Sequence, residues 1–221
     1  MVLVKSDMVE TRIKLKHLEI CLSKLAPHPK PKLGLEEYTL DSESAAKMLH
    51  IAGDIYDDIK KKSIIDLGCG TGILGIGATL LGAEYVVGVD LDGENIRTAT
   101  ENTRKMQVEV EYVVGDIEVI RGFFNTTLTN PPFGSWRRGT DVLFLRKALK
   151  VSDTVYSLHK AGESNRRFLI KKIESLGGKV DSISELKIII PHTFDFHRKE
   201  KYFVNAEMYR TISNRKHRIN D

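Results

Sequence analysis

The stretch Ser63-Ile64-Ile65-Asp66-Leu67-Gly68-Cys69-Gly70-Thr71-Gly72 is an apolar run that passes directly into three closely spaced glycines. Residues 63–67 have the length and composition of a buried strand, and residues 73–81 read as the helix that follows. Glycines at such a turn let the backbone approach a ligand, and the helix N-terminus offers free N–H groups. The stretch therefore predicts an α/β sheet that binds a nucleotide-like cofactor.

The spacing of the glycines narrows the choice of cofactor. The dinucleotide fingerprint G-x-G-x-x-G would need a glycine at position 73, where the chain has Ile73. The shorter pattern G-x-G-x-G is intact over residues 68–72. This argues against a nicotinamide dinucleotide.

Two further strands are predicted, each followed by an aspartate. Residues 85–89 lead to Asp90, which is placed to accept both hydroxyls of an adenosine ribose. Residues 108–114 lead to Asp116, which could accept from the exocyclic amine of adenine while Ile117 packs on the ring. Either aspartate could instead cap a helix, as we expect of Asp92 before a helix over residues 94–105.

A fourth predicted strand, residues 123–129, ends in Asn130-Pro131-Pro132-Phe133. The Asn side chain and the first Pro carbonyl can point two acceptors at one planar –NH₂ group, because Pro-Pro keeps the backbone extended. Phe133 offers a flat apolar surface on which a heterocycle or an amide could stack. The other interpretation is a plain turn after a strand.

N-terminal to the glycine turn, two helices are predicted. Apolar residues at helical spacing mark residues 7–25, and the proline-rich connector 27–32 ends that helix. A second helix should cover residues 42–59, capped by Asp41 or Ser42. We therefore expect one domain over residues 1–221, with an N-terminal helix and connector (1–40) and a catalytic α/β core (41–221).

The amino-acid composition limits the classes of protein to which the chain can belong. The chain has 221 residues, 41% of them hydrophobic, which suffices for one α/β domain with a full core. Its two cysteines, Cys21 and Cys69, have neither metal-ligand spacing nor the density of a secreted scaffold. No uncharged run approaches the length of a membrane span. We expect no structural zinc, no membrane association and a cytoplasmic location.

Charge is distributed unevenly along the chain. Residues 1–36 carry 7 Lys/Arg and 4 Asp/Glu, residues 37–131 carry 8 and 16, and residues 132–221 carry 19 and 10. The net charges are thus +3, −8 and +9. A basic C-terminal part predicts contact with a polyanion such as RNA, although solvated helix faces also explain individual basic clusters.

The glycine turn, Asp90, Asp116 and the Asn-Pro-Pro-Phe motif stand in the order found in class I S-adenosylmethionine-dependent amino-methyltransferases. Over roughly residues 30–210 the chain also resembles the methyltransferase-like protein 5 family, which methylates N6 of an adenosine in small-subunit ribosomal RNA. The strings that carry this resemblance are Leu35-Glu36-Glu37-Tyr38, Asn130 to Gly134 with Gly139-Thr140-Asp141, Val155 to Lys160, and Phe196-His197-Arg198-Lys199.

The resemblance implies a Rossmann-like, doubly wound, seven-stranded sheet, mostly parallel, in the order 3-2-1-4-5-7-6 with strand 7 antiparallel. It implies S-adenosyl-L-methionine as cofactor, RNA as partner and, from the eukaryotic members, a small zinc-containing activator protein. The predicted catalytic residues are Asn130, Pro131, Pro132 and Phe133. The predicted cofactor-binding residues are Tyr38, Asp66, Gly68, Gly70, Gly72, Leu74, Asp90, Leu91, Asp116, Ile117 and Asn130. The predicted RNA contacts are Trp136, Arg137, Arg138, His159, Lys160, His197, Arg198 and Lys199.

The chain departs from the family at two places. The family's Gln-Tyr-x-Thr element reads Glu37-Tyr38-Thr39-Leu40, so only Tyr38 is carried over. The loop after Gly134, residues 135–138, is shorter by one residue and more basic than the resemblance leads us to expect. Substrate contacts could therefore differ in detail at this loop.

Three other functions remain open on the sequence. A protein glutamine amide presents the same planar –NH₂ to the motif, although the basic C-terminal part argues against that substrate. Guanine N2 in RNA would fit the charge equally well. A noncatalytic RNA-binding subunit could keep the fold, but binding alone has no need of Asn130.

Overall fold

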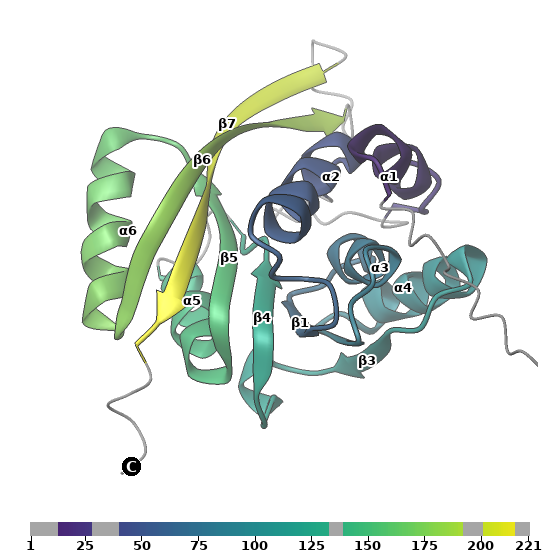
Figure 1. Ribbon diagram of the computed structural model, residues 1–221, viewed down its shortest axis with the longest axis horizontal. Coiled ribbons are helices and arrows are strands. Elements are labelled where there is room, and N and C mark those ends of the chain that lie inside the picture. The colour runs from purple at the N-terminus through teal and green to yellow at the C-terminus, as the bar shows by residue number, and fades with distance from the viewer. Residues whose placement is uncertain (1–12, 28–39, 133–138, 192–200, 215–221) are drawn as a thin grey trace, which may run out of the picture.

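The computed structural model describes residues 13–27, 40–132, 139–191 and 201–214, which build a sheet with helices on both faces (Figure 1). The strands are β1 (Ser63–Leu67), β2 (Tyr85–Asp90), β3 (Glu111–Val114), β4 (Phe124–Thr129), β5 (Ser152–Lys160), β6 (Gly178–Pro191) and β7 (Lys201–Ser213). The α-helices are α1 (Leu15–Leu22), α2 (Ser42–His50), α3 (Ile73–Leu80), α4 (Gly93–Met106), α5 (Thr140–Val151) and α6 (Glu163–Ser175). Two short helices are also present, the π-helical η2 (Ile51–Ile55) and the 3₁₀ turn η3 (Ile117–Val119).

The seven strands lie in the order β3-β2-β1-β4-β5-β7-β6, as predicted. Strands β1 to β5 pair in parallel, because helices carry the chain back after most of them. Strand β7 is antiparallel to both of its neighbours. The fold is that of the class I methyltransferases.

Strand β7 is also tied to the start of the sheet by side chains. The guanidinium of Arg210 donates through Nε to Asp58, 2.9 Å away, and the hydroxyl of Tyr156 donates to the same carboxylate over 2.6 Å. Asp58 precedes β1, Tyr156 lies on β5 and Arg210 lies on β7. One half-buried carboxylate therefore joins three distant parts of the chain.

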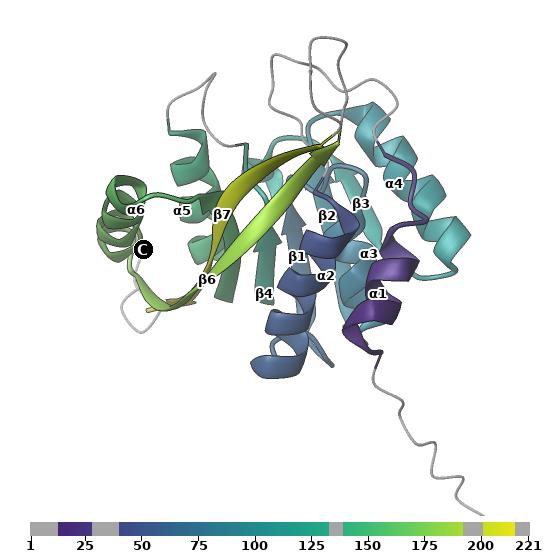
Figure 2. The same cartoon turned by 90° about the horizontal axis from the view of Figure 1, so that it is seen from above.

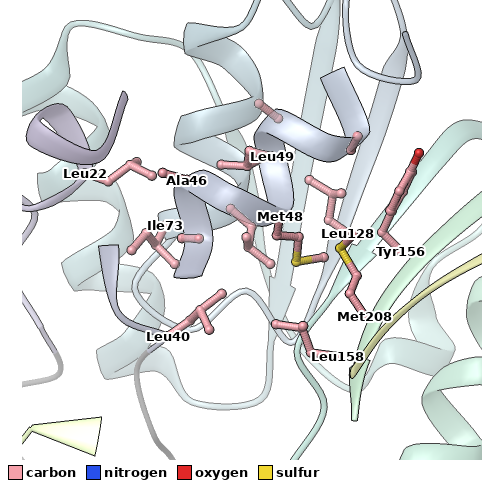
Figure 3. Packing of buried hydrophobic residues seen from close by; sticks show 14 of the residues in the cluster. Leu22, Leu40, Ala46, Met48, Leu49, Ile73, Leu128, Tyr156, Leu158 and Met208 are labelled. Carbon is pink, nitrogen blue, oxygen red and sulfur yellow. The ribbon is translucent and has the colours of Figure 1, made fainter. Parts of the chain in front are cut away.

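Two hydrophobic layers hold the helices against the sheet. On one face, α1, α2 and α3 pack on Leu128 and Tyr156, with Leu22, Met48 and Ile73 among the contributors (Figure 3). On the other face α5 packs on β1 and β2, and α6 packs beside it. Figure 2 shows the two sets of helices on opposite sides of the sheet. Neighbouring residues in β1 face opposite layers, which explains its continuous apolar run.

Several predicted boundaries need correction. The second helix was expected over residues 42–59, but α2 ends at His50 and continues only as the π turn η2. The third strand was expected from residue 108, but β3 begins at Glu111 because α4 runs to Met106 and Gln107 takes a left-handed φ of 55°. The predicted cap at Asp41 is confirmed, since its side chain accepts the Ser44 N–H at 2.9 Å.

Part of the predicted first helix, residues 7–12, lies outside the described residues. Within the parts of the chain that the structure describes, no helix combines the length and the apolar character that crossing a membrane requires.

Candidate active site

The glycine turn between β1 and α3 has the backbone conformation that its sequence predicts. Gly68, Gly70 and Gly72 all have positive φ, at 70°, 53° and 87°. A Cβ on Gly70 would meet nothing within 4 Å, so this glycine faces open space at the carboxyl edge of the sheet. A Cβ on Gly72 would lie 2.5 Å from the Tyr112 hydroxyl. The turn therefore leaves its backbone open to a ligand on one side and is packed on the other.

Asp66 lies directly before this turn and is almost completely buried, with 1% of its surface exposed. Its Oδ2 accepts the Gly75 N–H at 3.0 Å, whereas Oδ1 has no hydrogen-bond partner among the described residues. Burial raises the pKa of the carboxyl to about 7, and the nearby charge of Asp90 adds to the rise. A cationic or N–H donor from a ligand would satisfy Oδ1, and this fits the ammonium of S-adenosylmethionine.

Asp90 ends β2 and has a more crowded carboxylate. Oδ2 accepts the Gly70 N–H at 2.8 Å, and Oδ1 accepts the Asp92 N–H at 2.9 Å and the Asn95 side-chain amide at 3.2 Å. The side chain thus holds the glycine turn and the start of α4 together. Because each carboxylate oxygen can accept more than one bond, Oδ2 keeps capacity for a ligand hydroxyl. The next residue, Leu91, is exposed beside it.

Asp116 caps the short turn η3, as the alternative interpretation of the sequence held. Its Oδ1 accepts the Glu118 N–H at 2.8 Å. Ile117, expected against adenine, packs in the core on the α5 side of the sheet and shows only a small part of its surface. Leu74 is likewise buried in the core, so its position offers a cofactor the backbone of the first turn of α3 rather than a side chain.

Asn130 follows the last residue of β4, on the strand next to β1. Its Oδ1 is buried and has no hydrogen-bond partner among the described residues. Pro131 is buried and Pro132 half-buried, while the Thr129 hydroxyl donates to the Leu67 carbonyl at 2.8 Å. That bond ties the ends of β4 and β1, so the unsatisfied acceptors of Asn130 and Asp66 lie on adjacent strands at one edge.

The structure corrects one predicted RNA contact. His159 is 2% exposed, its ring lies edge-on to Tyr209 with centroids 5.4 Å apart, and Nε2 is 3.0 Å from the Ser157 hydroxyl. Burial lowers its pKa to about 4, so the ring is neutral at physiological pH. The prediction that His159 contacts phosphate is therefore wrong, because β5 extends to Lys160 and keeps His159 inside the sheet. Lys160 is exposed at the strand end.

Several predicted site residues lie outside the described parts of the chain. They are Tyr38, Phe133, Trp136, Arg137, Arg138, His197, Arg198 and Lys199.

Two residues that support the cofactor site were missed by sequence reasoning. Asn102 on α4 donates to the carbonyls of Thr71 and Ala26, both at 3.0 Å, and accepts the Ala26 N–H at 2.8 Å. It therefore fastens the end of the N-terminal helical segment to the glycine turn. The signal was its position three residues after Ala99 on the buried stripe of α4.

The second is Tyr112, which lies against Gly72 and against Gly88 in the middle of β2. A Cβ on Gly88 would come within 2.8 Å of the Tyr112 ring. A glycine inside a strand often marks such a close approach, so Gly88 was the available signal.

The chain is similar to known proteins along most of its length. The model of the family "Ribosomal protein L11 methyltransferase (PrmA)" matches residues 49–127, which include the glycine turn and most of β4. The rRNA N(6)-adenosine-methyltransferase Mettl5 of Drosophila melanogaster is 36% identical over 207 residues, covering 90% of this chain and 96% of the relative. An uncharacterized protein of Methanocaldococcus jannaschii is 39% identical over 211 residues, covering 90% of this chain and 94% of the relative.

Solved structures agree with the sequence relatives. A protein of Pyrococcus horikoshii, provisionally described as an RNA methyltransferase, superposes with a TM-score of 0.84 at 37% identity, covering 92% of this chain and 99% of the other. Magnesium protoporphyrin IX methyltransferase from Synechocystis, crystallised with S-adenosylhomocysteine, has a TM-score of 0.60 at 11% identity, covers 77% of this chain and 82% of the other, and supports the fold alone. The open glycine turn, the buried Asp66 oxygen and relatives that match along nearly their whole length lead to one conclusion: the chain belongs to the methyltransferase-like protein 5 family, and its methyl donor is S-adenosylmethionine.

Proposed function

We propose that the protein transfers a methyl group from S-adenosylmethionine to N6 of an adenosine in RNA, with small-subunit ribosomal RNA as the favoured substrate. The observation that carries the proposal is the buried Oδ1 of Asn130 at the end of β4, which has no hydrogen-bond partner among the residues that the structure describes. An unsatisfied buried acceptor costs about 1–3 kcal/mol, and a ligand –NH₂ would remove that cost. The adenosine methyltransferase of Drosophila, similar over most of its length, supports the choice of adenine.

The chemistry asks little of the protein beyond placement. The sulfonium of the cofactor supplies a methyl group that is already activated, so no strong base is needed. Adenine N6 is a poor nucleophile because its lone pair is delocalised into the ring. Hydrogen bonds from its two N–H groups to Asn130 Oδ1 and the Pro131 carbonyl favour the pyramidal, positively charging nitrogen of the transition state. Phe133 is proposed to hold the base by stacking.

A neutral acceptor suits this position. Asp66, on the adjacent strand, already shows what burial does to a carboxylate here, since its pKa is raised to about 7. A second carboxylate buried close by would also have a raised pKa. It would therefore carry a proton on an oxygen that would otherwise accept a hydrogen bond from the substrate –NH₂. The amide of Asn130 accepts a hydrogen bond at any physiological pH.

The distribution of charge favours RNA over a protein substrate. Residues 132–221 carry a net +9, against −8 for residues 37–131. Exposed cations of the described part of this basic half include Lys160 and Lys187, the latter on β6. The clamp admits the exocyclic amine only of a base that has left its stack, so an adenosine in a loop or a distorted helix is the expected target.

We also propose that a small partner protein adds to the free edge of β3. This strand pairs only with β2 among the described strands, and Val113 and Val114 on it are exposed. Unpaired edges favour strand addition by another chain. Glu109 and Glu111 are the charges that would oppose it, and the Glu111 carboxylate accepts the Tyr85 hydroxyl at 2.6 Å. Full methyl transfer by the chain purified alone would rule out a required partner.

Mass spectrometry of digested nucleosides tests the substrate. Ribosomal RNA that has not been methylated at its natural sites is incubated with the protein and cofactor carrying a labelled methyl group. We expect the label in N6-methyladenosine, at one position of the small-subunit RNA, and none with the Asn130→Ala variant. Label in N2-methylguanosine, or on a glutamine of an added ribosomal protein, would overturn the adenine assignment while leaving the fold and cofactor in place.

A further inference from the structure

A buried lysine lies under the turn that follows β3. Lys147, on α5, is 2% exposed. Its ammonium donates to the carbonyl of Ile120 at 2.8 Å and to the carbonyl of Glu118 at 3.1 Å, and the Glu118 carboxylate lies 3.6 Å away. Lysines are almost never buried unless their donors are used, and here all three have an acceptor nearby.

The two carbonyls belong to the end of η3, where a short helix leaves its last acceptors unpaired. Inside the turn, Val119 N–H donates to the Asp116 carbonyl at 3.0 Å and Ile120 N–H donates to the Ile117 carbonyl at 3.2 Å. Lys147 satisfies the acceptors that these bonds leave over. Arg146, its neighbour on α5, adds an ion pair of 3.0 Å with the Glu118 carboxylate.

Apolar contacts fix the same turn from the same helix. Ile117 and Ile120 are buried and pack in one cluster with Ala148 and Leu149 of α5. The hydrogen bonds of Lys147 and the apolar cluster together hold η3 in its position relative to the sheet. Asp116, the N-cap of η3, is the residue proposed to contact the adenine amine of the cofactor.

Charges of both signs surround Lys147. Burial lowers its pKa, and the Glu118 carboxylate acts in the opposite direction. Arg121 and Lys150 add to the lowering. Arg121 also donates to the Glu118 carbonyl, so two cations share one backbone acceptor.

We infer that Lys147 is a positioning residue for the adenine subsite: by holding the carbonyls of Glu118 and Ile120 it sets the place of the Asp116 carboxylate against the cofactor. The inference rests on the proposed contact between Asp116 and the adenine amine and is independent of the RNA substrate. The helix that carries Lys147, α5, begins at Thr140, shortly after the Asn-Pro-Pro-Phe motif in the chain.

Calorimetric titration with two probes tests this role. S-adenosylhomocysteine offers an exocyclic amine to Asp116, whereas S-inosylhomocysteine has a carbonyl oxygen at that position and an N–H in place of the acceptor N1. Lys147→Met keeps the length and apolar stem of the side chain but removes its donors. We expect S-adenosylhomocysteine to bind at most about threefold more weakly, the loss expected when the Asp116 contact itself is removed, and S-inosylhomocysteine to bind with nearly unchanged affinity, so that discrimination between them shrinks. Saturating cofactor should restore the turnover rate, because KM for the cofactor changes and kcat does not.

Lys150→Met, on the same helix with an exposed lysine, is the matched control and should leave both affinities unchanged. Lys147→Gln keeps one shorter donor and should lose less discrimination, which provides a second variant if Lys147→Met does not fold. Equal weakening of both probes would show a general loss of structure and would overturn the inference, as would no change in either. Failure of the RNA assay would leave these binding results untouched.

Discussion

The carboxyl ends of β1 and β4 differ from those of β2 and β3 in how their polar side chains are satisfied. Asp66 and Asn130, on β1 and after β4, each have a buried oxygen without a partner among the described residues. Asp90, at the end of β2, accepts from the backbone N–H groups of Gly70 in the glycine turn and of Asp92, and Asp116, after β3, accepts from the N–H of Glu118. All four residues lie along one edge of the same sheet.

The four residues therefore have two different roles within one site. At the ends of β2 and β3 the carboxylates already accept hydrogen bonds from backbone N–H groups and hold turns together. A ligand can therefore use only their remaining acceptor capacity. At β1 and β4 the acceptors are buried and unused, and each costs stability until a donor arrives. We therefore place the groups that must be recognised most sharply, the cofactor's ammonium and the reacting amine, at β1 and β4.

The largest expected effect is that of Asn130→Ala on methyl transfer. Removing one preorganised acceptor of the transition state should lower kcat by about 10² or more, while the affinity for the cofactor stays the same. Single-turnover transfer and calorimetric titration measure the two quantities. Thermal stability should not fall, since the deleted oxygen has no hydrogen-bond partner among the described residues. A variant that keeps its activity would make the motif a structural turn.

Asp66→Asn should separate binding from stability. Cofactor affinity should fall by about thirtyfold, because a buried charge-assisted bond to the ammonium is lost. The folded-state pKa of about 7 lies above the usual value near 3.9 for an unfolded aspartate. The wild-type protein therefore loses free energy of unfolding as the pH rises from about 4 to 7, and the asparagine variant does not.

Denaturant unfolding at two pH values checks this prediction. At pH 8 the Asp66→Asn variant should be more stable than the wild type, by on the order of 2 kcal/mol, and at pH 4 the two should be alike. A variant less stable at pH 8 would mean that the ionised carboxylate has a partner, and the contrast between the two pairs of strand ends would disappear.

Asp90→Ala should show the opposite combination. Cofactor affinity falls by about tenfold as the ribose contact is lost, and stability falls as well, because Gly70, Asp92 and Asn95 lose their acceptor. Asp90→Asn keeps an acceptor and should recover most of the stability. If Asp90→Ala binds the cofactor unchanged, Asp90 is removed from the binding site.

The smallest effect belongs to Asp116. Asp116→Ala should cost about 1 kcal/mol of stability through the lost cap of η3 and weaken the cofactor only about threefold. Asp116→Asn keeps the cap and should restore the stability. A loss of affinity as large as that of Asp66→Asn would place a main recognition contact at β3 and contradict the ranking.

The family resemblance supplied the strand order, and the sequence pattern was sufficient for the glycine turn and less so for the surroundings of the site. Apolar runs and glycines at fixed spacing are signals within a short stretch of sequence. The bounds of β1, β2 and β4 could therefore be predicted to within a residue or two. His159 was misplaced because the same string of residues fits a strand tip or a strand interior, and only pairing with β7 decides between them.

Lys147 and Asn102 could not be assigned for a related reason. Their partners are backbone atoms 27 and 31 residues or more away in sequence, and a backbone carbonyl leaves no mark on the residue type. Gly88 carried a readable signal because close packing against Tyr112 restricts the residue itself. A contact that restricts the residue type at both positions is easier to predict from sequence than a contact to a backbone atom.

The place of β7 has a consequence for how the chain is made. This strand follows β6 in the sequence yet lies between β5 and β6 in the sheet, and its Arg210 meets Asp58, which precedes β1. On the ribosome, β6 therefore emerges before the strand that connects it to the sheet, and the edge of β5 stays open until residues 201–213 follow. The first half of the domain can form its parallel layers during synthesis, whereas closing the sheet must wait for the last strand.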